Sequence, residues 1–184
     1  VPLDRSIIDR LGDPIVHLVR NAVDHGVEPA DEREAAGKPL EGSVELRARR
    51  EGSEVVVEVE DDGRGVDVDA VHERAVERGL VDANADPPES EVLACLFYPG
   101  FSTATEVTKT SGRGVGLDVV HEVAEALNGD VTVETEPGEG TLVRLRLPVS
   151  VATLEVLFVK TGGERYALPI EAIEHVGREG GARI

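Results

Sequence analysis

The sequence is short of cysteine and of long apolar runs, and each shortage excludes a class of protein. Cys95 is the only cysteine, which rules out an internal disulfide and a metal site made of several cysteines. We expect it to be a small buried hydrophobe. The longest apolar stretch, 151–159, is interrupted by Glu155 and is too short to span a bilayer. The single cysteine fits a reducing cytoplasm. Val1 opens the chain with neither an initiator Met nor a leader, so nothing marks the chain as secreted and we expect a fragment of a longer protein.

Positive charge is also scarce. The chain has 37 acidic residues against 19 Lys and Arg, for a formal net charge of -18. Such a field repels nucleic acids and anionic lipid headgroups, so neither is an expected partner. Only Lys38, Lys109 and Lys160 are lysines. Because salt screens carboxylates, we interpret this acidic excess as the mark of a halophilic source.

The remaining composition is globular, and 184 residues suffice for one domain and part of another. Between Asp13 and His25, helical spacing predicts a helix with an apolar face that packs and a polar face that presents chemistry. The apolar face is Val16, Val19 and Val23, and the polar face is His17, Asn21 and His25. The segment 28–42, rich in charge, Gly and Pro, predicts a loop or irregular helix.

Alternation of apolar and charged residues predicts two hairpins, each with a buried face. The first joins strands around 44–48 and 55–59 through a turn at 51–53, and the second joins strands around 131–133 and 143–147. Helices are expected at 68–78, 90–97 and 115–127. The segment 98–114 has no hydrophobic period and is long for a connector, which favours a functional lid.

Three clusters of residues suggest a chemical role. Asn21 offers a neutral amide oxygen that suits Mg²⁺, with Arg20 beside it to counter phosphate charge, although this face could also be a solvated helix surface. Asp61 opens an Asp-x-Gly-x-Gly turn, where a carboxylate can accept a hydrogen bond from an exocyclic amine such as that of adenine. A plain acidic turn is the alternative.

The third cluster is the glycine-rich run 112–117, which opens a helix whose free amides could hold phosphate oxygens. Alone it is a weak signal. It differs from a dinucleotide fingerprint because no βαβ unit follows, and from a Walker A loop because the Gly-Lys-Ser/Thr ending is absent. Two His-acid dipeptides, at His72 and His121, resemble phosphoacceptor sites, but both lie on helices of the same domain and we expect neither to be one. A zinc site from His17 and His25 lacks further ligands.

The order of these clusters, with Gly140-Thr141 leading into the last strand, resembles the GHKL nucleotide-binding fold of gyrase, the ninety-kilodalton heat-shock chaperones, histidine kinases and MutL. The resemblance covers about 3–148. Within that superfamily, the segments 17–26, 96–103 and 111–120 are similar to hallmarks of the chemotaxis histidine kinase family CheA. The tail, 149–184, resembles the start of the SH3-like, CheW-like regulatory domain of that family.

The resemblance implies an α+β fold: a two-layer α/β sandwich with a mixed sheet covered on one face by helices, over 1–148. It implies ATP and Mg²⁺ as cofactors, with Asn21 binding the metal, Asp61 contacting adenine, and His17 and Asn21 serving catalysis. The implied nucleotide contacts are Arg20, Asn21, Asp24, His25, Asp61, Gly63, Gly65, Lys109, Ser111, Gly112, Arg113, Gly114, Val115, Gly116, Leu117 and Thr141.

The reaction that this family implies is transfer of the γ-phosphate to a histidine on a separate phosphotransfer domain. His17 stands where hydrolytic relatives place a Glu that activates water, which favours a kinase over an ATPase; its role as base or as phosphate contact stays open. A GHKL-type ATPase and a nucleotide-independent scaffold are the alternatives. Implied partners are the phosphoacceptor histidine domain in trans, a CheW-type coupling protein, chemoreceptors and response regulators, with a homodimeric full-length protein.

Overall fold

The structure is a computed structural model that describes residues 5–101, 116–149, 156–170 and 173. The chain divides into two compact units, Val1–Val151 and Ala152–Ile184, and each is described by itself. Within the described part of the chain, no helix combines the length and the apolar character that a membrane span needs.

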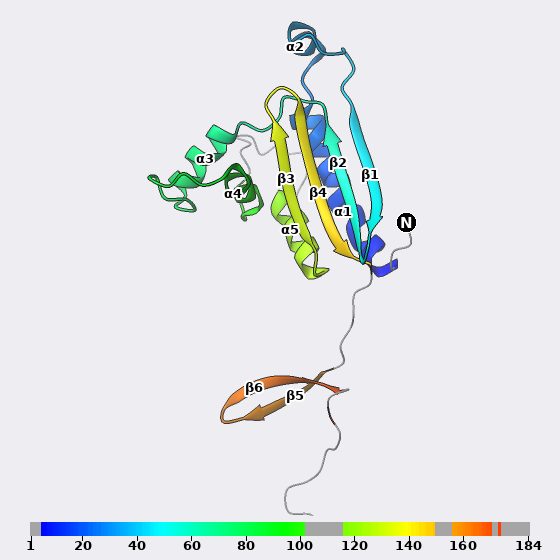
Figure 1. The fold of residues 1–184 in the computed structure, drawn as a ribbon, viewed down its shortest axis with the longest axis vertical. Coiled ribbons are helices and arrows are strands. Elements are labelled where there is room, and N and C mark those ends of the chain that lie inside the picture. The colour runs from blue at the N-terminus through cyan, green and yellow to red at the C-terminus, as the bar shows by residue number, and fades with distance from the viewer. Residues whose placement is uncertain (1–4, 102–115, 150–155, 171–172, 174–184) are drawn as a thin grey trace, which may run out of the picture. The chain divides into compact units, whose positions relative to one another are not determined.

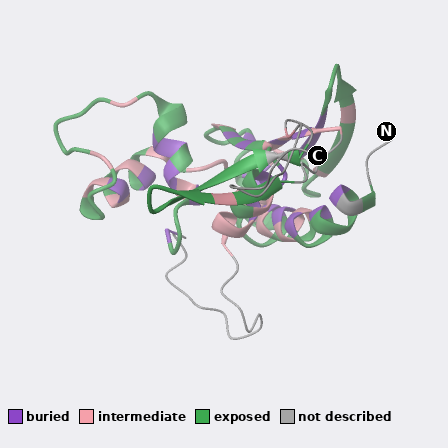
Figure 2. Ribbon diagram, turned by 90° about the horizontal axis from the view of Figure 1, so that it is seen from below, coloured by how far each residue is buried: buried purple, intermediate pink, exposed green. Residues whose placement is uncertain are grey.

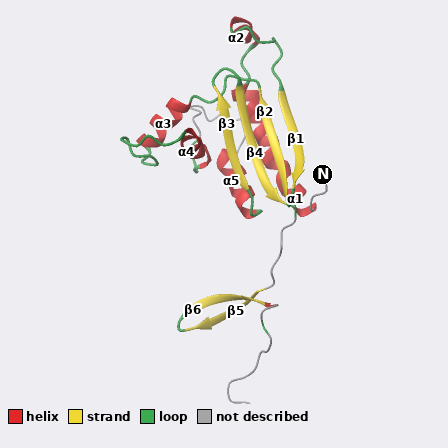
Figure 3. Cartoon of the chain, viewed as in Figure 1, coloured by secondary structure: helices red, strands yellow, loops and turns green. Residues whose placement is uncertain are grey.

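Four strands form the sheet of the first unit, β1 (Val44–Glu51), β2 (Glu54–Asp61), β3 (Asp130–Glu136) and β4 (Gly140–Pro148), in the order β1-β2-β4-β3 (Figure 1, Figure 3). Both expected hairpins are present. Every described pair of neighbours is antiparallel, so the expectation of a mixed sheet is wrong for these strands. The short turn of a hairpin makes its own two strands antiparallel. It does not determine how one hairpin runs against the other.

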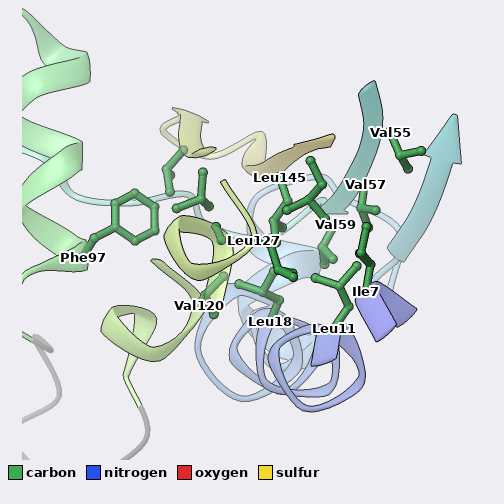
Figure 4. Close-up of a cluster of buried hydrophobic side chains, with 14 of the residues drawn as sticks. Ile7, Leu11, Leu18, Val55, Val57, Val59, Phe97, Val120, Leu127 and Leu145 are labelled. Atoms are coloured by element: carbon green, nitrogen blue, oxygen red, sulfur yellow. The ribbon is translucent and has the colours of Figure 1, made fainter. Parts of the chain in front are cut away.

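Two helices, α1 (Arg5–Asn21) and α5 (Leu117–Ala126), cover one face of this sheet. In Figure 4 their side chains meet those of the central strands β2 and β4. The cluster includes Leu11 and Leu18 from α1, Val120 from α5, and Val57 and Leu145 from the sheet, all at most 3% exposed. Burial of apolar surface between the layers supplies the main favourable free energy of the fold. The two-layer α+β sandwich with helices on one face is therefore confirmed.

The helix α1 packs through a different face from the one expected. Val16 and Val23 are more than half exposed, whereas Ile7, Leu11 and Leu18 are buried. The helix starts at Arg5, eight residues earlier than its expected start at Asp13, and carries Pro14 within it. Proline is unfavourable inside a helix, but the residues before it bury apolar side chains against the sheet and thereby select the packing face.

The first unit also contains a smaller cluster, formed by the helices between β2 and β3. It involves α3 (Val68–Glu77), α4 (Glu89–Ala94) and the 3-10 turn η2 (Cys95–Phe97), as expected from the sequence. Val71, Val92, Cys95 and Phe101 are buried together. Figure 2 shows buried stretches, coloured purple, on helices as well as on the sheet. Cys95 is thus a small buried hydrophobe, as predicted.

The edge strand β1 departs from the expected burial pattern. Its apolar Leu46 is 52% exposed, although its partner across the ladder, Val59, is buried. On the opposite face of the sheet, Glu58 of β2 lies between Arg49 of β1 and Arg144 of β4 and pairs with both. One face of the sheet therefore forms the apolar core and the other is held by ion pairs.

The second unit is described as a hairpin, β5 (Val156–Thr161) and β6 (Glu164–Pro169), joined at Gly162 and Gly163. Both glycines have positive φ values, 60° and 91°, which glycine adopts without steric cost. Phe158 is 71% exposed and Tyr166 46% exposed. Both are therefore exposed apolar side chains on the described hairpin.

Candidate functional site

The first part of the candidate site is the end of α1 and the π-helical turn that continues it, η1 (Ala22–Gly26). The turn is closed by the amide of Val27, which donates to the carbonyl oxygen of Ala22 at 2.8 Å. Such wide turns within helices occur often at functional sites. It replaces the regular helix that we expected up to His25, and it turns Asp24 and His25 toward solvent, where both are exposed.

Asn21 and His17 lie one turn apart and contact each other. The amide nitrogen Nδ2 of Asn21 is 3.0 Å from Nε2 of His17. Burial lowers the pKa of His17, and the positive charge of Arg20 lowers it further, against an opposing effect of Asp118. A neutral imidazole can accept the amide proton at Nε2, so Asn21 directs its carbonyl oxygen Oδ1 away from the ring. That oxygen is the atom suited to a hard cation.

The second part is Asp61, the last residue of β2, which is 8% exposed. Its Oδ1 accepts a hydrogen bond from the amide of Gly63 at 3.0 Å. Burial raises the pKa of this carboxyl, and hydrogen bonds from the Gly63 and Thr141 backbones oppose the shift. Thr141 pairs with Asp61 across β2 and β4. The carboxylate is therefore sheltered from water and held in one orientation, as recognition of a ligand amine requires.

Backbone segments approach the Asp61 turn so closely that glycine is required there. A Cβ atom on Gly63 would lie 2.1 Å from the carbonyl oxygen of Gly26, and one on Gly26 would lie 2.9 Å from the Asp61 carboxylate. The amide of Arg64 donates to that same Gly26 oxygen at 2.9 Å. Gly65 has a φ of +76° and lies against the Glu136 carbonyl. The turn is thus enclosed between η1 and the β3–β4 hairpin.

The third part, the start of α5, is only partly described. Gly116 and Leu117 open the helix, and Oδ1 of Asp118 accepts from the amide of Val119 at 2.9 Å. Six predicted nucleotide contacts lie outside the described residues: Lys109, Ser111, Gly112, Arg113, Gly114 and Val115. The helices α1 and α5 pack against each other in one core, and Asp118 acts electrostatically on His17.

The structure therefore brings Gly26, at the end of η1, against the Asp61 turn. At the other side of the first cluster, α1 packs with α5 in one core, and Asp118 lies close enough to His17 to affect its pKa. Arg20 is exposed on the same helix. Of the two His-acid dipeptides, His121 stacks on Phe97 with ring centroids 5.7 Å apart, which gives it a packing role.

Sequence reasoning missed three charged residues beside this turn. Glu28, Arg33 and Lys38 come from the segment read as a loop or irregular helix, which holds the short helix α2 (Ala30–Ala35). Arg33 is fully buried and pairs with Asp62, the residue after Asp61. Charged residues in a Gly- and Pro-rich segment are normally exposed, so the sequence offered no reason to expect a buried ion pair there. The second Asp of the turn, Asp62, was the one residue that could have suggested a cationic partner.

Comparison with known proteins places these features in a family. The profile of the histidine kinase-, DNA gyrase B-, and HSP90-like ATPases matches residues 8–151. The chemotaxis protein CheA of Halobacterium salinarum is 47% identical over 180 residues, which is 97% of this chain and 27% of that protein. The CheA of Bacillus subtilis is 44% identical over 173 residues, 93% of this chain and 26% of that protein.

The chain therefore spans only about a quarter of the length of these relatives. Among solved structures, the blue-light activated histidine kinase of Erythrobacter litoralis EL346 aligns with 81% of this chain and 32% of its own. That alignment has 19% identity and a TM-score of 0.46, which is too low to support any conclusion.

Proposed function

Because the chain belongs to the family of histidine kinase-, DNA gyrase B-, and HSP90-like ATPases, we propose that it is the nucleotide-binding catalytic domain of a chemotaxis-type histidine kinase. It binds Mg²⁺-ATP and transfers the γ-phosphate to a histidine on a separate domain. The relatives that carry the name CheA supply the chemotaxis context.

The observation that carries this proposal is the enclosed Asp61 turn. Its carboxylate is buried, is oriented by two backbone amides, and is flanked by Gly26 and Gly63, where a Cβ atom would collide. A flat ring with an exocyclic amine fits such a place, because the amine can donate to the carboxylate while backbone without side chains lies close to the ring. We assign the adenine of ATP to this turn, with Gly65 and Thr141 beside it.

Asn21 fits a magnesium role by its chemistry. Mg²⁺ prefers oxygen ligands and is held in nucleotide sites by few protein groups together with phosphate oxygens and water. The contact of the Asn21 amide nitrogen with His17 presents the oxygen end as a ligand. When bound, the metal would neutralise phosphate charge. Arg20, Asp24, His25 and the glycine run 112–117 complete the proposed contacts to the nucleotide.

His17 supports transfer over hydrolysis. Its lowered pKa keeps the imidazole neutral near pH 7, so it can accept a proton or donate a hydrogen bond to a phosphate oxygen. It carries no negative charge with which to activate water as a Glu would. Phosphoryl transfer depends chiefly on positioning and on charge neutralisation, and the residues named here act in those two ways.

The rest of the proposal concerns the longer protein. The phosphoacceptor domain acts in trans, and a CheW-type coupling protein, chemoreceptors and response regulators are the signalling partners of a cytoplasmic homodimer. We assign 1–148 to the catalytic domain and 149–184 to the start of a CheW-like, SH3-like regulatory domain.

Calorimetric titration with ATP, with and without Mg²⁺, tests the proposal. We expect the chain to bind ATP, with Mg²⁺ increasing the affinity in the wild type and not in Asn21→Ala. Adding an isolated acceptor domain then separates the two reactions: a kinase labels the acceptor histidine, whereas an ATPase releases phosphate at the same rate without it. A chain that binds no ATP under either condition is a scaffold, and the proposal fails.

A further inference from the structure

Four charged residues form a cluster against the Asp61 turn, with side chains that range from fully buried to 38% exposed. Glu28, Arg33 and Lys38 come from the segment around α2, and Asp62 comes from the turn itself. The Arg33 fork donates to both carboxylate oxygens of Asp62, at 3.1 and 2.8 Å, and to Glu28 at 3.0 Å. The arginine side chain has no exposed surface. Two cations and two carboxylates therefore form a neutral group.

Lys38 completes the cluster through the backbone of the turn. Its ammonium group Nζ donates to Oε1 of Glu28 at 2.8 Å, to the carbonyl oxygen of Asp62 at 2.8 Å and to that of Gly63 at 2.7 Å. An ammonium group has three donors, and all three are used. Consecutive carbonyl oxygens of the turn are therefore fixed by one charge.

The electrostatics agree with this geometry. Burial alone would raise the pKa of Glu28, but the hydrogen bond from Lys38 and the charges around it lower the pKa overall. Burial would also raise the pKa of Asp62, but hydrogen bonds from the Ser43 amide and from Arg33 lower it overall. A largely buried ion cluster contributes little net stability compared with apolar packing of the same volume. The contacts of this cluster with the turn backbone therefore suggest a role beyond stability.

We propose that Arg33 and Lys38 are positioning residues for recognition of the nucleotide base, a role that rests on the proposed function. The peptide between Asp62 and Gly63 carries the amide that orients the Asp61 carboxylate, at 3.0 Å. Lys38 holds the carbonyl oxygens on both sides of that amide, and Arg33 holds the Asp62 side chain. Neither cation touches the base. They act by fixing the carboxylate, since small displacements in a recognition site weaken it strongly.

Lys38→Met tests this role, with Arg47→Met as the matched control, because Arg47 is a half-exposed cation on the outer sheet face. The first readout needs no nucleotide: amide hydrogen exchange of Gly63 and Arg64, with Val57 as a reference for global folding. We expect exchange at the turn to become at least tenfold faster in Lys38→Met, with Val57 unchanged and Arg47→Met like the wild type. Lys38→Arg, which keeps the charge, should recover part of the protection.

The second readout is the ratio of ATP to GTP affinity, which a general loss of stability does not alter. We expect the preference for ATP to fall at least fivefold in Lys38→Met and to stay unchanged in Arg47→Met. The positioning role would be overturned if Lys38→Met exchanged its turn amides at the wild-type rate, or exchanged them faster but kept the wild-type ratio of ATP to GTP affinity. Either result would leave the proposed function intact. If the wild type binds no ATP, the proposed function itself fails, and the base-recognition role fails with it.

Discussion

Neutralising Glu58 should destabilise the fold in a pH-dependent way. Its side chain is 5% exposed and pairs with Arg49 and Arg144 on the outer face of the sheet. The hydrogen bond from Arg49, then that from Arg144, lowers the pKa of Glu58 from 4.5 to about 2 against the opposing effect of burial. The variant Glu58→Gln keeps the shape and an acceptor oxygen but removes the charge.

The magnitude follows from the pKa shift. A change of 4.5 to about 2 is about 2.5 pKa units, or at most about 3.4 kcal/mol in the free energy of unfolding. Because the side chain of Arg49 is 42% exposed, solvent screening reduces the expected loss to about 1–2 kcal/mol. Since the folded pKa is depressed, this stabilisation is complete above pH 4.5 and disappears as the pH falls toward 2.

Urea unfolding at pH 7 and pH 3 measures the effect. Circular dichroism is the suitable signal, because the sequence contains no tryptophan. Glu58→Gln should lose about 1–2 kcal/mol at pH 7 and clearly less at pH 3. Glu134→Gln, a partner of Arg144 that is 60% exposed, should lose less than about 0.5 kcal/mol. An equal loss in Glu58→Gln at the two pH values, or none at pH 7, would refute the reasoning.

Three further changes probe the core and the site. Leu145→Ala, at a position with no exposed surface, should reduce the free energy of unfolding by about 2–5 kcal/mol in urea titrations; a loss below about 1 kcal/mol contradicts the core described. Gly63→Ala should weaken ATP binding more than tenfold in calorimetry, because its Cβ would meet the Gly26 carbonyl oxygen. Gly79→Ala is the control: its backbone is strained, but its Cβ would lie in open space, so ATP binding should not change. Equal effects of the two variants would exclude a steric cause. NMR titration should give His17 a pKa below 6.5 that rises in Arg20→Gln. A midpoint at or above 6.5 would contradict the effect of burial and of Arg20 on this ring.

Local patterns were sufficient to predict the hairpins and most helices. The turn at Gly52 and the apolar pattern of β2 are set by residues that are neighbours in sequence. The structure confirms this hairpin, with strands paired from Val44 opposite Asp61 to Glu51 opposite Glu54. These features need no information from distant parts of the chain.

Features that depend on distant contacts were missed. The packing face of α1 was misassigned because Ile7 and Leu11, which lie before the expected start of the helix, select it. The burial of Arg33 was not predicted, since nothing near it in sequence reveals that Asp62 will pair with it across 29 positions. In the candidate site, Asp61 and Gly63 form the predicted turn. The ion cluster that contacts this turn joins residues far apart in sequence, so the sequence alone did not predict it.

Calorimetric titration of the Asp61→Asn variant with Mg²⁺-ATP tests the central claim most directly. The substitution keeps the size of the side chain but replaces the carboxylate that should accept from the adenine amine. A hydrogen bond to a charged group contributes about 1.5–3 kcal/mol, so the affinity should fall about 10- to 100-fold with the fold intact. Wild-type affinity in a folded Asp61→Asn protein would contradict the assignment of the nucleotide to this turn.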